Sequence, residues 1–124
     1  RFLGLLAALL GPDSANLYIF DEIDTGLHPA RLYLLLQLLE WRTSKGNLQV
    51  IGTTHSSQVL RLLSQEAKSF ASLVYRLPET PQGQIKRIEA IPDISRILET
   101  QDIAHLHETG WFEDVMYFDA EFVE

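Results

Sequence analysis

Residues 17–22 read Leu-Tyr-Ile-Phe-Asp-Glu, four apolar residues followed directly by two carboxylates. An unbroken apolar run is typical of a strand that is buried on both faces of a helix-covered parallel sheet. The acid pair then lies at the carboxyl end of that strand, where open α/β sheets bind their ligands. One carboxylate there can hold Mg²⁺ on a phosphate while the next orients or deprotonates a water. Taken alone, the pair is equally compatible with an acidic turn that has no catalytic role.

The composition describes a small globular domain. The chain has 124 residues, of which 46% are hydrophobic, which is enough for a core and argues against disorder. Because there is no cysteine, a disulfide framework and a thiolate metal site are excluded. The apolar stretches are too short to span a bilayer and no signal peptide is evident, so we expect a cytoplasmic protein. The net charge of −7 disfavours nucleic-acid binding by this chain, although a larger parent protein could still bind it.

A second strand is predicted over residues 47–53, and Thr-Thr-His-Ser-Ser follows it at 53–57. Between the two strands, Pro29 suits the first position of a helix and Gly46 suits its stop. Leucines recur in this segment at helical spacing, at positions 32, 35, 36 and 39. The connection is long enough for a right-handed βαβ unit, which would bring both strand ends to one edge of the sheet.

Two carboxylates and an imidazole would then face one crevice, which suits water attack on a phosphoryl group. In this interpretation Asp21 holds the cation, Glu22 is the general base, and His55 contacts the γ-phosphate or positions the water. A lone histidine after a strand can instead be a hydrogen-bonded structural residue. The Thr and Ser residues around His55 favour a polar pocket. For His28, just before a helix-starting proline, a capping or surface role is sufficient.

The remaining segments predict further elements. Residues 1–10 form an apolar helix that we expect to be buried, with Gly-Pro as its stop. Residues 70–77 and 84–91 are strand-like and flank a turn-rich segment, which predicts a hairpin. Asp93 is a candidate helix cap. Beyond Gly110 the sequence is aromatic and acidic, and no element is assigned to it.

These motifs resemble those of a known family. Leu-Tyr-Ile-Phe-Asp-Glu resembles the Walker B motif of ABC-type ATPases, and Ile-Asp-Thr-Gly-Leu-His-Pro at 23–29 resembles the D-loop region of their RecF/SMC/OLD-like branch. Ile-Gly-Thr-Thr-His-Ser at 51–56 resembles the switch-histidine loop, and residues 1–10 are similar to the helix that follows the signature motif. Order and spacing agree over about residues 1–77. Ile23 and Ser57 depart from the pattern, since relatives often have proline at these positions.

The resemblance implies a fold and a set of roles. The fold would be α/β, a partial P-loop NTPase sheet with flanking helices, parallel core strands and a C-terminal hairpin. Residues 1–91 would be the C-terminal portion of the ATPase domain, and residues 92–124 an extension of unknown role. ATP and Mg²⁺ are the implied cofactors, with Asp21 on the metal, Glu22 as base and His55 as γ-phosphate sensor. The residues expected at the nucleotide sandwich between two copies of the protein are Thr25, Gly26, Leu27 and His28.

One family element is missing from the sequence. No G-x-x-x-x-G-K-[ST] phosphate loop occurs in these 124 residues, and the signature motif expected just before Arg1 is absent as well. We therefore expect the C-terminal part of an ATPase that is inactive alone. The alternative is a non-catalytic interaction or dimerisation module derived from an ATPase fold. The missing loop favours that alternative for the isolated chain, whereas the retained Asp21, Glu22 and His55 favour an ATPase parent.

Overall fold

The computed structural model describes residues 2–11 and 16–122, with side chains as far as Tyr117. The chain divides into two compact units, residues 1–63 and residues 64–124. The predicted domain boundary at residues 91 and 92 lies inside the second unit, and the assignment of 1–91 to an ATPase domain stays a prediction.

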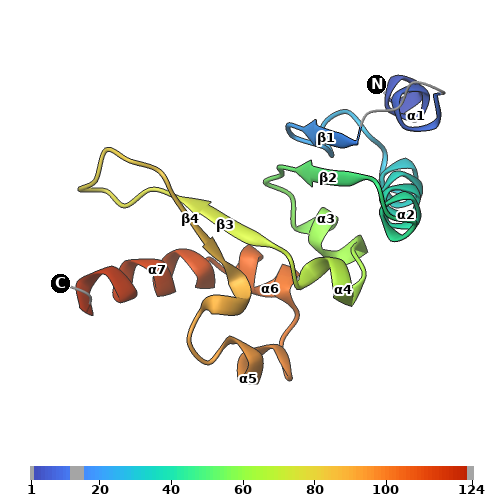
Figure 1. The fold of residues 1–124 in the computed structure, drawn as a ribbon. Coiled ribbons are helices and arrows are strands. Elements are labelled where there is room, and N and C mark those ends of the chain that lie inside the picture. The colour runs from blue at the N-terminus through green and yellow to red at the C-terminus, as the bar shows by residue number, and fades with distance from the viewer. Residues whose placement is uncertain (1, 12–15, 123–124) are drawn as a thin grey trace. The chain divides into compact units, whose positions relative to one another are not determined.

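The first unit contains the predicted βαβ arrangement. Strands β1 (Leu17–Phe20) and β2 (Gln49–Gly52) are parallel neighbours, with Leu17 opposite Gln49 and Phe20 opposite Gly52. Figure 1 shows both strands pointing the same way, with helix α2 (Pro29–Ser44) forming the crossover between them. Helix α1 (Phe2–Leu10) precedes the sheet and helix α3 (Ser57–Leu62) follows it.

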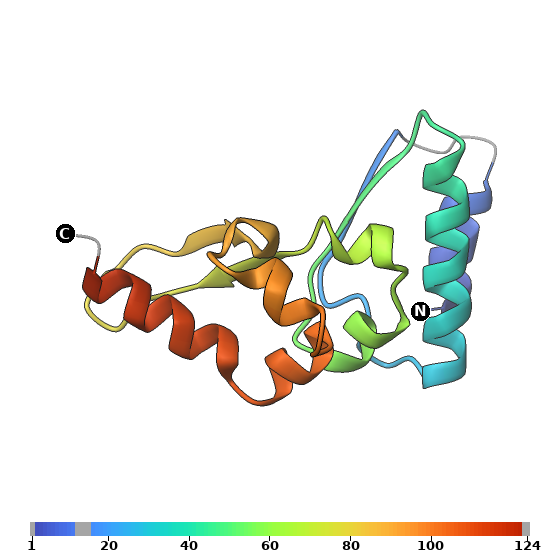
Figure 2. The same ribbon diagram turned by 90° about the horizontal axis from the view of Figure 1, so that it is seen from below.

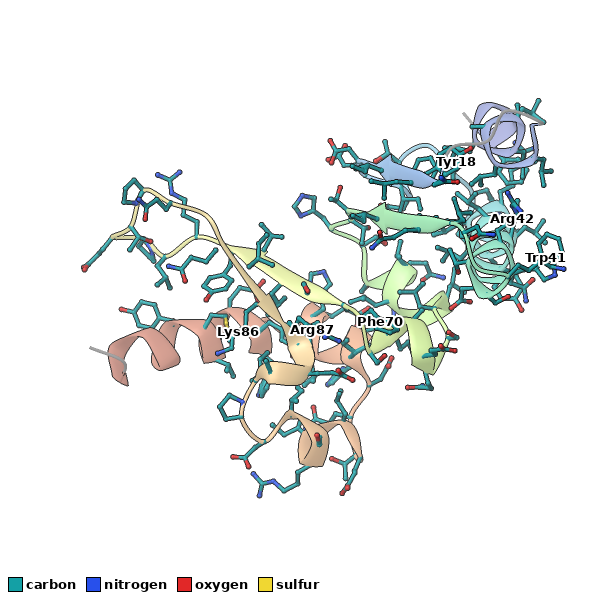
Figure 3. All side chains as sticks on the ribbon, viewed as in Figure 1. Tyr18, Trp41, Arg42, Phe70, Lys86 and Arg87 are labelled. Atoms are coloured by element: carbon teal, nitrogen blue, oxygen red, sulfur yellow. The ribbon has the colours of Figure 1, made fainter. Side chains whose placement is uncertain are left out.

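One hydrophobic core holds this unit together. Figure 2 shows α1 and α2 side by side, and the predicted leucine face of α2 provides most of the core. Tyr18 on β1 ties the sheet to α1, because its hydroxyl donates a hydrogen bond to the carbonyl of Ala8 at 2.6 Å (Figure 3). The buried members of the core are Leu9, Ile23, Leu32, Leu35, Leu36, Leu39 and Val59.

The prediction that β1 is buried on both faces is wrong. Ile19 is 68% exposed and Ile51, its partner on β2, is 46% exposed, whereas Tyr18 and Phe20 pack against the core. Side chains alternate between the faces of a sheet, and no described segment of this first unit covers the face that carries Ile19. The predicted full burial of residues 1–10 is wrong for a similar reason, since α1 buries Leu9 and leaves other leucines exposed.

The second unit contains the predicted hairpin. Strands β3 (Ser72–Tyr75) and β4 (Gln84–Arg87) are antiparallel, with Ser72 opposite Arg87 and Tyr75 opposite Gln84. The helices of this unit are α4 (Gln65–Lys68), the 3₁₀ turn η1 (Ile88–Ala90), α5 (Ile94–Leu98), α6 (Ile103–Glu108) and α7 (Trp111–Phe122). Among the described residues, no helix of either unit is long and apolar enough to cross a membrane.

Two local features of this unit differ from expectation. Asp93 precedes α5 as predicted, but its φ is 63° and its side chain makes no capping hydrogen bond. Helix α7 was not predicted, although Phe112 and Met116 are both buried and stand four residues apart, as on one face of a helix. Glu113 and Asp114 also lie in its first turn, where negative charge is favourable.

Neighbouring leucines of α2 test which face of that helix carries the stability of the first unit. Leu35 is 0% exposed and Leu34 is 56% exposed. We expect Leu35→Ala to lower the free energy of unfolding by about 2–5 kcal/mol, because it leaves a cavity in the core. The matched variant Leu34→Ala should change it by less than about 0.5 kcal/mol. Urea unfolding followed by circular dichroism measures both, and equal losses would contradict the described packing.

Candidate functional site

The two strand ends meet at one edge of the sheet, and backbone hydrogen bonds continue beyond them. The Thr53 N–H donates to the carbonyl of Phe20 at 2.9 Å, and the Ile23 N–H donates to the carbonyl of Thr53 at 3.0 Å. Asp21 and Glu22 lie between these two bonds. Both acids are exposed, while Ile23 is 4% exposed and belongs to the core. The acid pair is therefore a short turn held at both ends by the same residue of the neighbouring segment.

The side chain of Thr53 contacts the acid pair as well. Its hydroxyl donates to Asp21 Oδ1 at 2.6 Å and accepts a hydrogen bond from the Glu22 N–H at 2.9 Å. With its backbone bonds included, Thr53 is hydrogen-bonded to each of the consecutive residues 20–23. These bonds fix both the direction of the Asp21 carboxylate and the path of the backbone at Glu22.

Glu22 has an unusual backbone conformation. Its φ is 50°, in the left-handed region that favours glycine. Such a conformation costs a residue with a side chain about 1–2 kcal/mol, and strain of this kind gathers at functional sites. The turn places the Glu22 carboxylate on the exposed side of the sheet edge, where a substrate and a water could reach it.

Two tight turns connect the acid pair to helix α2. The Thr25 N–H donates to the Glu22 carbonyl at 3.0 Å, and the Leu27 N–H donates to the Asp24 carbonyl at 3.2 Å. Gly26 lies in the second turn with φ 78°, in the left-handed region that favours glycine. The predicted capping role of His28 is confirmed, because its Nδ1 accepts a hydrogen bond from the Ala30 N–H at 3.2 Å.

His55 lies two residues beyond Thr53, between two anchored neighbours. The Thr54 hydroxyl donates to Asp24 Oδ1 at 2.6 Å and accepts from the Ser56 N–H at 3.0 Å. Ser56 caps α3 by accepting a hydrogen bond from the Gln58 N–H at 3.1 Å. The imidazole is exposed and belongs to the same sheet edge as the acid pair. Its role toward a phosphate stays a prediction.

Sequence reasoning missed Thr53, Thr54 and Asp24 as members of the site. The threonines were read only as polar neighbours of His55. The sequence did contain a signal for them. A parallel pairing of the two predicted strands places Thr53, which follows the second strand, beside Asp21, which follows the first. Hydroxyls at that point face carboxylates, and such pairs form strong charge-assisted hydrogen bonds.

The oxygen donors of this edge fit one mode of magnesium binding. Over residues 2–11 and 16–117, no three side chains of His, Cys, Asp or Glu come together as a metal site would need. Mg²⁺ on a nucleotide is usually held by one or two carboxylates together with phosphates and waters, so a protein cage is not required. The carboxylate of Asp21, which the Thr53 hydroxyl orients, is suited to be such a ligand.

The left-handed conformation of Glu22 gives a prediction for stability. Glu22→Gly should raise the free energy of unfolding by about 0.5–1 kcal/mol, because relief of the strained φ exceeds the added chain entropy. The matched variant Glu22→Gln keeps the strain and should stay within about 0.5 kcal/mol of the wild type. Urea unfolding of the three proteins checks this, and a glycine variant no more stable than the glutamine variant would show that φ is ordinary in solution.

Comparison with known proteins is informative for the first half of the chain. Residues 1–61 match a family described as "AAA domain, putative AbiEii toxin, Type IV TA system". A Helicobacter pylori (strain ATCC 700392 / 26695) protein named ATP/GTP phosphatase is 36% identical over an alignment of 76 residues, and the alignment covers 57% of this chain and 20% of that protein. The chain thus spans about a fifth of the length of this relative. No solved structure matches the chain.

The matched residues include both strands, the acidic turn and the histidine loop. The similarity to AAA-type ATPase domains and to the named phosphatase therefore includes the segment that carries the candidate site.

Proposed function

We propose that this chain is a segment of an ATP-hydrolysing protein and provides the acid pair and the histidine of its nucleotide site. The observation that carries the proposal is the exposed Asp21-Glu22 turn, held by Thr53 at the carboxyl edge of a parallel strand pair. This edge is where α/β sheets bind ligands. The family match over residues 1–61 and the name of the H. pylori relative support the same conclusion.

Each polar group of the edge has a distinct task in this proposal. Asp21 holds the nucleotide-bound Mg²⁺, which would neutralise charge on the phosphate oxygens. Glu22 accepts a proton at its carboxylate from the attacking water. His55 donates a hydrogen bond to the γ-phosphate from its ring N–H.

The rest of the nucleotide site lies outside this sequence in our proposal. These 124 residues contain no phosphate loop, so the backbone cradle and lysine for the phosphates come from elsewhere in the protein. We place the parent in the RecF/SMC/OLD-like branch of the ABC-type ATPases. The loop of Thr25 to His28 would then contact a second copy across a nucleotide sandwich. Its exposure, apart from the half-buried Leu27, is compatible with that contact.

The catalytic base is tested in the full-length protein that contains this segment. Glu22→Gln should lower the rate of ATP hydrolysis about 10²–10⁴-fold, because the amide cannot accept the proton. ATP affinity should change less than about threefold, since the fold and the remaining contacts persist. Steady-state ATPase assays and nucleotide titrations measure the two effects. Glu79→Gln, in an exposed hairpin loop, is the matched control. Unchanged turnover in Glu22→Gln would favour the alternative of a non-catalytic interaction module.

The 124-residue chain itself gives a second test. Isothermal titration with Mg-ATP should show no binding in the micromolar range, because the chain lacks the phosphate loop that provides most phosphate contacts. The full-length protein titrated under the same conditions is the control. Micromolar binding to the short chain would mean that its exposed edge forms a nucleotide site unaided, and our division of the site would be wrong.

A further inference from the structure

We propose that Thr53 is a positioning residue for phosphoryl transfer, acting through Asp21 and Glu22 without touching the nucleotide. This inference rests on the proposed function. The geometry that carries it is the set of hydrogen bonds from Thr53 to residues 20–23, two through its backbone and two through its hydroxyl. One side chain thereby sets both the direction of the metal ligand and the backbone of the base.

The hydroxyl bonds can be removed separately from the backbone bonds. Valine has the shape of threonine without the hydroxyl, so Thr53→Val preserves the pairing with Phe20 and Ile23. It leaves Asp21 Oδ1 without the 2.6 Å donor and the Glu22 N–H without its acceptor. Ile23 stays anchored in the core, so the turn as a whole keeps its place. The change is then confined to the two acidic residues.

A small displacement there has a large expected effect on rate. Glu22 already has φ 50°, and the bond from its N–H to the Thr53 hydroxyl supports that conformation. A general base must lie within hydrogen-bond reach of the proton that it takes, and an error near 1 Å can cost about 100-fold. Residues that orient a metal ligand typically affect metal affinity or activity about 10–100-fold.

A second threonine repeats the arrangement one residue later. The Thr54 hydroxyl donates to Asp24 and accepts from the Ser56 N–H. Together the two hydroxyls join the acidic turn to the segment that leads into His55. The proposed base and the proposed phosphate sensor are therefore parts of one hydrogen-bonded edge, which is the arrangement that a positioning role requires.

The test uses the full-length protein with Thr53→Val, Thr53→Ser and Thr53→Ala. We expect kcat to fall about 10–100-fold in the valine and alanine variants while KM for ATP changes less than about twofold. The Mg²⁺ concentration for half-maximal activity should rise as well. Thr53→Ser, which keeps the hydroxyl, should restore kcat to within about threefold. Thr80→Val removes a hydroxyl from the hairpin loop, where it donates to the Leu77 carbonyl, and should leave kcat unchanged.

Two results would overturn the positioning role. One is wild-type kcat in both variants without the hydroxyl. The other is a serine variant as slow as the valine variant, since the methyl group and its packing would then explain the loss. A failure of the proposed function is recognised separately, because Glu22→Gln would then keep full turnover whatever Thr53 does.

Hydrogen exchange in the 124-residue chain tests the geometry without any ATPase activity. The Glu22 amide should exchange at least about tenfold faster in Thr53→Val than in the wild type, because it loses its acceptor. Thr53→Ser should restore the slow rate. Equal rates in the wild type and Thr53→Val would overturn the role of the hydroxyl, even where the chain proves unrelated to ATP hydrolysis.

Discussion

The hydrogen bonds of Thr53 are the constraint on which the candidate site depends. Two parallel strands end at Phe20 and Gly52, and the next residue of the second strand is bonded to each of residues 20–23. A turn with two adjacent carboxylates would otherwise be mobile and subject to charge repulsion. Here the turn has one path, a left-handed Glu22 and an oriented Asp21. That preorganisation is what chemistry on a phosphate requires of its acidic groups.

The hydrophobic core stabilises the same turn, because the residue that follows the acid pair is buried in it. Ile23 belongs to the cluster formed by the leucines of α2, so the chain is anchored immediately after the acid pair. His28 then caps α2, and Pro29 begins it. The carboxylates remain in water, where their charge is not penalised by burial. Burial of Ile23 stabilises the chain directly after Glu22, and this stabilisation offsets the strain of the left-handed conformation at Glu22.

The sequence was sufficient for the elements whose pattern is local. Four such features were predicted and are present: the strand at 17–20, the leucine face of α2, its start at Pro29, and the hairpin. Exposure of Ile19 was not predictable, because burial of a strand face depends on what covers it and not on the strand itself. The role of Thr53 was missed because it depends on the register of the two strands. The register places its hydroxyl beside Asp21 and Glu22, about thirty positions earlier in the chain. Helix α7 was missed although its apolar spacing was visible.

A double-mutant cycle between Thr53 and Asp21 tests the central claim most directly. Unfolding free energies of the wild type, Thr53→Val, Asp21→Ala and the double variant give the coupling between hydroxyl and carboxylate. The structure predicts a coupling of about 1 kcal/mol or more, as expected for a short hydrogen bond to a charged group. Additive losses, with a coupling below about 0.5 kcal/mol, would show that the two side chains act independently and would contradict the described turn.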